Sequence, residues 1–203
     1  MRRPRPHRRA RRGPDGERGA VLVEFSMVAL IIVTLVAGSY DYGMAWRTGL
    51  EVTEASRTGA RVGSGQGKEL NADFSLLSGL RSALSSSGLL AQVQRVVIFQ
   101  STADNGRVPA DCITTTGTGT ACNALTGQQL RDMPTSIGTG TLTSTGCLSA
   151  SAIKKWCPTT RNNTQLTAQY MGVWVQVRHD YLFRLIGTST LIEKTTVMRL
   201  EPD

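Results

Sequence analysis

The sequence predicts an α+β protein in which a long N-terminal helix crosses a membrane and continues into a small antiparallel sheet domain. Two observations carry this prediction. An apolar run with a single formal charge, residues 20–40, follows a tract of arginines. Three later segments, 93–101, 170–181 and 189–200, are rich in β-branched or alternating residues, as strands are. The chain therefore divides into a leader (1–19), a long helix (20–63) and a sheet domain (64–203).

The positive charge of the chain is concentrated in the leader. Of the formal charge of +8, the leader carries +6, because Asp15 and Glu17 offset only two of its eight arginines. These arginines are Arg2, Arg3, Arg5, Arg8, Arg9, Arg11, Arg12 and Arg18. The remaining 184 residues hold 15 basic and 13 acidic side chains, without a basic stripe that would contact phosphates. We therefore expect no nucleic-acid partner.

The run 20–40 has the length of a membrane span. As a helix of 21 residues it would extend about 30 Å, close to the hydrocarbon thickness of a bilayer. Arginines directly before such a run hold that end in the cytoplasm, so residues 41–203 are expected outside it. A buried helix of a soluble core is one alternative. A signal peptide cleaved near Ala37 is another, but the helical pattern continues past that point without a break.

A stripe of small and apolar residues follows the span at helical spacing. Its charged neighbours, Glu54, Arg57 and Arg61, take other faces of the predicted helix extension, residues 41–63. Such a stripe allows the close approach of another helix, which belongs either to a partner subunit or to the protein's own domain. The stripe consists of Gly49, Val52, Ala55, Ser56, Gly59 and Ala60.

Glu24 is the one carboxylate within the apolar run. In the middle of a bilayer a carboxylate costs about 2.5 to 3.5 kcal/mol, so a buried Glu24 needs a partner or a purpose. The residues around Glu24 suggest a purpose. A basic leader ends in Gly19, Ala20 follows, and Glu24 and Phe25 come four and five residues later. This arrangement resembles the prepilin-peptidase site of type IV pilins, in which Glu occupies position five of the mature chain.

A longer stretch resembles one pilin-like family. Residues 18–64, including "EASRTGAR" at Glu54–Arg61, resemble the N-terminal region of TadE-like proteins, minor pilin-like components (pseudopilins) of tight adherence (Tad) pilus systems. The segment Thr195–Pro202, "TTVMRLEP", resembles the ending of that family. Phe25 departs from the pattern of the major Tad pilins, which favour Tyr there.

The resemblance implies a pilin-like first helix, a location in the bacterial inner membrane and three kinds of partner: the membrane, other pilin-like subunits and a prepilin peptidase. It implies cleavage between Gly19 and Ala20, after which Glu24 pairs with the new N-terminal ammonium of a subunit. An opposite charge in a low dielectric favours the ionised form of both groups. An uncleaved single-pass envelope protein that assists pilus assembly or binds a partner is the competing hypothesis.

The sheet domain is expected to contain one packed helix. Asn71 is expected to cap it, and Gly88 to end it. In the segment 170–181, valines alternate with Trp174, Gln176 and Arg178, which predicts a strand buried on one face only. The helix would bury Phe74, Leu77, Leu80 and Leu84 on one side.

Between the first and second predicted strands lies a Thr- and Gly-rich segment, about 102–168, which we expect to be an irregular loop held by disulfides. It contains all four cysteines, Cys112, Cys122, Cys147 and Cys157. Outside the cytoplasm such thiols oxidise. Two equal spacings of ten favour the pairs Cys112–Cys122 and Cys147–Cys157, although three connectivities are possible. A zinc site is disfavoured because the chain has no C-x-x-C pair and only one histidine, His179, beyond the leader.

No catalytic motif is present in the sequence. It contains no G-x-S-x-G elbow, no phosphate-binding loop and no H-E-x-x-H helix. Asp41 and Glu51 follow the span without a partner histidine, and His179 on a predicted strand is typical of a structural residue. We expect a protein that is not an enzyme and takes no cofactor, metal or small-molecule substrate; an exported enzyme is the least favoured alternative.

Overall fold

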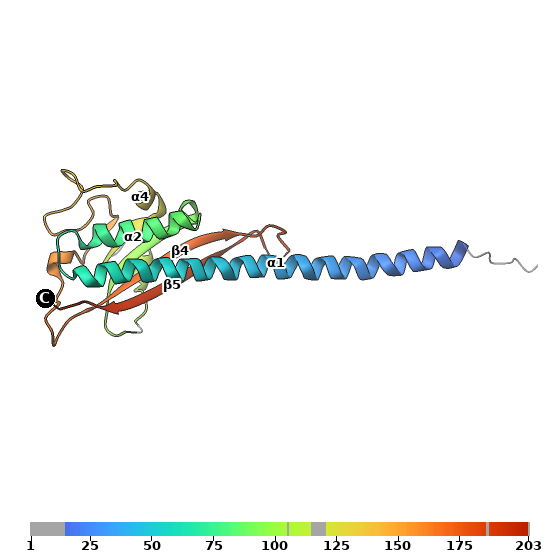
Figure 1. Ribbon diagram of the computed structural model, residues 1–203, viewed down its shortest axis with the longest axis horizontal. Coiled ribbons are helices and arrows are strands. Elements are labelled where there is room, and N and C mark those ends of the chain that lie inside the picture. Colours follow the sequence, from blue (N-terminus) through green and yellow to red (C-terminus); the bar gives the residue numbers. More distant parts are fainter. Residues whose placement is uncertain (1–14, 105, 115–120, 186, 203) are drawn as a thin grey trace, which may run out of the picture.

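The computed structural model describes residues 15–104, 106–114, 121–185 and 187–202, and it confirms the α+β class. A single helix, α1 (Asp15–Gln66), is 52 residues long. Its second half lies along a compact domain and its first half projects from that domain as an isolated rod (Figure 1). The helix begins at Asp15 rather than at residue 20, so the last residues of the predicted leader are helical. The leader arginines before Asp15 lie outside the described residues.

The domain is built on one antiparallel sheet of five strands in the order β3-β2-β1-β4-β5. The three predicted strands are present as β1 (Val93–Ser101), β4 (Tyr170–Asp180) and β5 (Ser189–Arg199). The other two, β2 (Cys122–Thr126) and β3 (Ile153–Lys154), come from the segment expected to be an irregular loop. That expectation was too simple, because pairing with β1 gives β2 its backbone partners. The same segment forms α3 (Ala110–Ile113), α4 (Gly127–Arg131) and the 3-10 turn Pro158–Thr160.

The packed helix is α2 (Ala72–Ser86), and a short 3-10 turn, Leu90–Gln92, joins it to β1. Gly88 ends it as predicted. Gly88 has φ +75°, and the amides of Gly88 and Leu89 donate to the carbonyls of Ser85 and Leu84 over 3.1 and 2.9 Å. This is a Schellman motif, in which a left-handed residue satisfies the last helical carbonyls.

The expected cap at the other end of α2 is wrong. Asn71 occupies the N-cap position, but its side chain makes no capping hydrogen bond. Its backbone has φ −94° and ψ 3°, which is not the extended conformation that directs a capping side chain towards the first helical amides.

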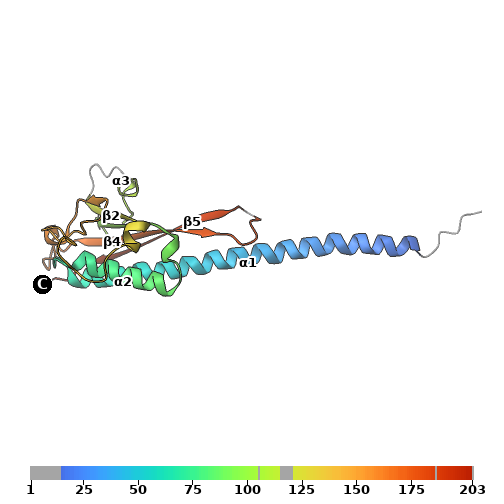
Figure 2. The same ribbon diagram turned by 90° about the horizontal axis from the view of Figure 1, so that it is seen from above.

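Two hydrophobic cores lie on opposite faces of the sheet. The larger one joins α1 and α2 to the inward valines of β1 and β4. On the other face, α3 covers a smaller cluster (Figure 2). Because Trp174 is buried in this second cluster, β4 is covered on both faces in its middle, and the prediction of a strand buried on one face is wrong there. The smaller cluster contains Val97, Phe99, Cys112, Cys122, Ala124, Ile153 and Trp174.

The small-residue stripe of α1 packs within the protein. A β-carbon added at Gly59 would lie 3.3 Å from the β-carbon of Leu80 in α2. The hydroxyls of Ser56 and Thr196, in β5, are 2.7 Å apart. The chain's own α2 and β5 therefore cover the stripe, and the interpretation that a helix of another subunit packs there is wrong. The stripe residues Gly49, Val52, Ala55, Ser56, Gly59 and Ala60 are all buried.

Candidate functional site

The projecting half of α1 leaves its apolar side chains uncovered. Ala37 is the first of its described residues to be buried. Within the part of the chain that the structure describes, α1 is the one helix long and apolar enough to cross a membrane, and it is compatible with a single-pass anchor. Twelve large apolar residues here are 51–70% exposed: Val21, Leu22, Val23, Phe25, Met27, Val28, Leu30, Ile31, Ile32, Val33, Leu35 and Val36.

The hydroxyl groups of this half are satisfied by the helix itself. Ser26, Thr34 and Ser39 each donate to a backbone carbonyl three or four residues earlier, over 2.7 to 2.8 Å. Hydroxyls paired in this way fit a lipid environment, where no water replaces a missing hydrogen bond.

The residues of the predicted cleavage site lie on the same exposed rod. Gly19 and Ala20 are exposed, and a β-carbon added at Gly19 would have no neighbour within 4 Å. Glu24 lies one helical turn beyond Ala20 and is also exposed, as is Phe25. No hydrogen bond or ion pair joins Glu24 to any other described residue. Unlike the hydroxyls of this half, its carboxylate is therefore not satisfied within the described chain.

Asp41, at the other end of the apolar run, has a role that sequence reasoning missed. Its carboxylate is buried and accepts hydrogen bonds from the backbone amides of Leu182 and Phe183, over 3.0 and 3.1 Å. The ring of Phe183 meets that of Tyr40 edge-on, with centroids 5.9 Å apart. Asp41 therefore ties the turn after β4 to α1. The only signal in the sequence was an acidic residue between two tyrosines where the apolar run ends.

His179 is a satisfied structural residue. Its Nδ1 lies 3.1 Å from the hydroxyl of Thr48 in α1, and its ring packs edge-on against Tyr181 with centroids 5.5 Å apart. The hydroxyl of Thr48 also donates to the carbonyl of Met44, over 3.0 Å. His179 thus links the end of β4 to the helix.

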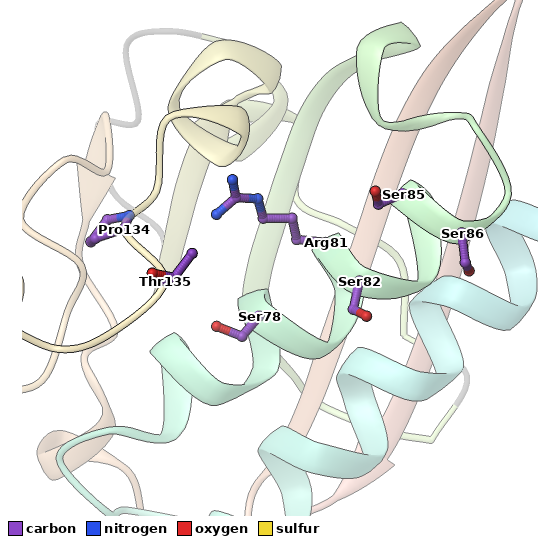
Figure 3. Close-up of a pocket in the computed structure, with 7 residues that line it drawn as sticks. All are labelled: Ser78, Arg81, Ser82, Ser85, Ser86, Pro134 and Thr135. Carbon is purple, nitrogen blue, oxygen red and sulfur yellow. The ribbon is translucent and has the colours of Figure 1, made fainter.

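The hollow beside α2 contains several hydroxyl groups but no partner that would activate them. Its lining includes Arg81 (Figure 3). The Arg81 guanidinium donates to the backbone carbonyl of Met133. A serine nucleophile needs an adjacent base, and no His, Asp or Glu among the described residues lines this hollow. The lining residues are Ser78, Arg81, Ser82, Ser85, Ser86, Pro134 and Thr135.

The four cysteines form the two local disulfides that their spacing favours, Cys112–Cys122 and Cys147–Cys157. The first joins α3 to the start of β2 inside the smaller core. Because cysteine binds zinc as a free thiolate, this pairing leaves no cysteine ligand for the alternative zinc site.

One family matches part of the chain. Residues 19–61 match the family described as TadE-like protein. This TadE-like segment begins at Gly19, ends at Arg61 of "EASRTGAR" and covers about a fifth of the 203 residues. It does not extend to Thr195–Pro202. No curated protein and no solved structure matches the chain. The match suggests a component associated with a Tad pilus.

The TadE-like segment has two structural parts within one helix. Residues 19–36 form the exposed apolar rod, and residues 37–61 carry the stripe that packs on the domain. The later stretch Thr195–Pro202 packs against this second part and its continuation, because Ser56 contacts Thr196 and the amide of Glu201 donates to the carbonyl of Ser64 over 3.0 Å. The two stretches that resemble the family are therefore in contact.

Proposed function

We propose that the protein is a minor pilin-like subunit, or pseudopilin, that acts in the assembly of a Tad-type pilus from the bacterial inner membrane. The observation that carries the proposal is the first part of the TadE-like segment, a helix whose apolar side chains its own domain leaves uncovered. A continuous apolar surface of this extent needs lipid or another apolar helix around it. A helix that first anchors the protein in the membrane and then moves into a bundle of pilin-like subunits is surrounded by lipid in the first state and by apolar helices in the second.

We propose that the N-terminus faces the cytoplasm and the sheet domain lies outside it. Two features support this orientation. The arginines of the leader directly precede the span, and positive charge is retained on the cytoplasmic side. All four cysteines of the domain are paired, which fits the oxidising side of the membrane.

We further propose that a prepilin peptidase removes the leader after Gly19 and that Glu24 then pairs with the N-terminal ammonium of a subunit. Gly19 is exposed in the first turns of α1. A helical glycine is about 1 kcal/mol less stable than alanine, so Gly16 and Gly19 favour local opening of the helix at the bond to be cut. The exposed carboxylate of Glu24, unpaired among the described residues, provides the acceptor for the ammonium.

The proposed role is assembly rather than catalysis. Among the residues that the structure describes, the hydroxyls beside α2 have no neighbouring base, and the Nδ1 of His179 is paired with the hydroxyl of Thr48. The remaining candidate is a single-pass anchored protein that keeps its leader and assists the pilus from the membrane. The apolar rod supports this second candidate equally well. The observation that distinguishes the two is therefore whether the leader is removed or retained.

The decisive experiment is the intact mass of the protein purified from membranes of its own host, with and without active prepilin peptidase. A mature chain that begins at Ala20 only when the peptidase is active supports the cleaved pilin-like subunit. A leader that is retained under both conditions supports the uncleaved anchor and contradicts the proposed role of Glu24. A Gly19→Leu variant, which blocks the site without changing the span, is expected to keep its leader.

A further inference from the structure

The hairpin formed by β4 and β5 reaches past the rest of the sheet towards the projecting half of α1 (Figures 1 and 2). The described residues after β4 at its end, 181–185, are called the hairpin tip. The tip carries an unusual concentration of exposed apolar side chains. Leu182 is 68% exposed, and Phe183 and Leu185 are each 50% exposed.

The hairpin tip lies beside the apolar run. Phe183 lines an apolar groove together with residues of α1 that all belong to the predicted span. The farthest of them, Ile32, precedes Tyr40 by eight residues, or about 12 Å along a helix. The hairpin tip is therefore level with the last turns of the span. The α1 residues of this groove are Ile32, Val33, Val36, Ala37 and Tyr40.

The position of the hairpin tip is fixed. The buried carboxylate of Asp41 accepts both the Leu182 and the Phe183 amide, and the Phe183 ring rests on Tyr40. A hairpin held by charge-assisted hydrogen bonds keeps its level relative to the helix. Whatever surrounds residues 32–40 of α1 must therefore also surround the tip.

We propose that the hairpin tip inserts into the outer interface of the lipid bilayer beside α1, so that the protein contacts the membrane at two points. This inference rests on the proposed function, in which residues 20–40 span the membrane. The chemistry of the tip fits a lipid interface. Leu182, Phe183 and Leu185 present apolar surface, while the exposed Arg184 between them can reach lipid phosphates.

The neighbouring residues of α1 indicate the same level for the interface. Tyr40, Tyr42 and Trp46 are 50%, 64% and 63% exposed and lie within two turns at the end of the span. Tyr and Trp are enriched where a bilayer meets water.

A second contact with the membrane has a structural consequence, because one helix alone would leave the domain free to rotate about the helix axis. The inserted hairpin tip fixes which face of the domain is turned away from the membrane.

Tryptophan fluorescence in lipid tests the inference on the full-length chain. A Phe183→Trp substitution places the reporter at the tip, and Leu185→Trp provides a second reporter that does not touch Asp41 or Tyr40. Both are made in a Trp46→Phe background, because Trp156 and Trp174 are buried and Trp46 is not. The protein is reconstituted in vesicles of phosphatidylethanolamine and phosphatidylglycerol with brominated acyl chains, which quench tryptophan on contact.

Two control positions, made in the same Trp46→Phe background, calibrate the measurement. Val33→Trp reports on the span itself, and Leu166→Trp reports on the far end of the domain, because Leu166 is 95% exposed and precedes β4 at the end away from the tip. Once the signal of the Trp46→Phe parent is subtracted, we expect the added tryptophan at both tip positions and at Val33→Trp to lose most of its fluorescence in brominated vesicles, relative to unbrominated ones. Leu166→Trp is expected to lose almost none.

The other outcomes separate this inference from the proposed function. Quenching at Val33→Trp without quenching at either tip reporter would overturn the inference and leave the membrane anchor in place. An absence of quenching at all positions would overturn the anchor as well. A third outcome is that neither brominated lipid nor aqueous acrylamide quenches the tip reporters, and that this protection disappears when the protein is diluted with additional lipid. That outcome would show that a second copy covers the tip, and it would overturn insertion into lipid.

Discussion

Glu24 and Asp41 are carboxylates near opposite ends of the same apolar run, and they differ in burial and in hydrogen-bond partners. Asp41 is buried and satisfied by two backbone amides of the hairpin. Glu24 is exposed on the rod and has no hydrogen-bond or ion-pair partner among the described residues. Since a carboxylate in hydrocarbon is costly without a partner, we infer that the partner of Glu24 comes from another molecule.

Replacement of Glu24 tests that inference. In Glu24→Gln we expect surface pili to fall to the level of a strain without the protein, because a neutral amide cannot pair with an ammonium. Membrane fractionation should be unchanged, since the span becomes more apolar. Ser26→Ala is the matched control, because the Ser26 hydroxyl already bonds to the carbonyl of Val23. Filament counts by electron microscopy provide the measurement, and normal assembly in Glu24→Gln would contradict ammonium pairing.

A second residue-scale feature is a buried polar network that ties three segments of the domain together. The Arg161 guanidinium forms a buried ion pair with Asp73 in the first turn of α2 and stacks 4.3 Å from the ring of Trp156. Asn123, in β2, donates to Asp73 over 2.7 Å and exchanges hydrogen bonds with the backbone of Trp156. The network thereby joins α2, β2 and the segment before β4.

Removing one member of this network should be costly. We expect Asp73→Ala to lower the free energy of unfolding by about 3 to 5 kcal/mol, because the Arg161 charge stays buried without its counter-ion. Glu69→Ala, an exposed acidic residue in the preceding turn, should change it by less than about 0.5 kcal/mol. Urea denaturation monitored by circular dichroism measures both. Equal effects of the two substitutions would rule out a stabilising role for the network.

At the scale of elements, the packing of α1 on α2 determines which part of the TadE-like segment is buried and which part stays exposed. Both helices bury their inner faces against each other and against the sheet. Gly59 and Gly63 allow the close approach, since a β-carbon at Gly63 would lie 2.5 Å from Leu76. The part of α1 that its own domain leaves uncovered is consequently the rod before Ala37 and the outer face of the extension.

Two glycines of α1 test this division. Gly59→Leu should reduce the free energy of unfolding by about 1 to 3 kcal/mol, because the larger side chain would be forced against Leu80. Gly43→Leu should not destabilise the domain, since no atom lies within 4 Å of a β-carbon there. Thermal unfolding of both variants in detergent gives the comparison. If Gly43→Leu were the more damaging, the described contact of α1 with α2 would be incorrect.

The disulfides act on the same scale. Replacing Cys112 and Cys122 together by Ala should cost about 2 to 3 kcal/mol, as should replacing Cys147 and Cys157, because each bridge closes a short loop. Urea midpoints measure the loss, and the mass of iodoacetamide-treated protein reports whether the remaining pair is still oxidised. Free thiols in a single-pair variant would indicate that the two bridges depend on each other.

At the scale of the whole molecule, the chain consists of a projecting apolar rod that buries little and a domain packed around the second half of α1. Among the described residues of the apolar run 20–40, Ala37 is the one buried side chain. The extension, in contrast, supplies Val52, Ala55 and Ala60 to the main core. The boundary between anchor and domain therefore falls inside α1, near Tyr40, and not at its end.

Truncation tests this boundary. A chain that begins at Ser39 keeps Tyr40 and Asp41 and should fold as a water-soluble domain, with a free energy of unfolding within about 1 kcal/mol of the full-length protein. A chain that begins at Ala60 loses Val52 and Ala55 and should not fold, because α2 and β5 lose the helix that covers them. Circular dichroism and gel filtration distinguish the two. A folded shorter fragment would show that the extension is not part of the domain.

The sequence alone determined the features that depend on neighbouring residues. The apolar run, the helix that continues from it, α2 with its end at Gly88, the three long strands and the favoured cysteine pairs all follow from local periodicity or short spacing. The residues of the TadE-like segment were also recognisable, because the family pattern lies within one continuous stretch.

Only the tertiary structure decided which surfaces meet. The strands β2 and β3, the cover over Trp174, the occupation of the stripe by α2 and β5, and the role of Asp41 all depend on residues far apart in the chain. Asp41 and Leu182 are separated by 141 positions, and no local pattern connects them. Periodicity identifies a face that will be buried, but the element that buries it is chosen by packing and by the pairing of backbone groups across the whole fold.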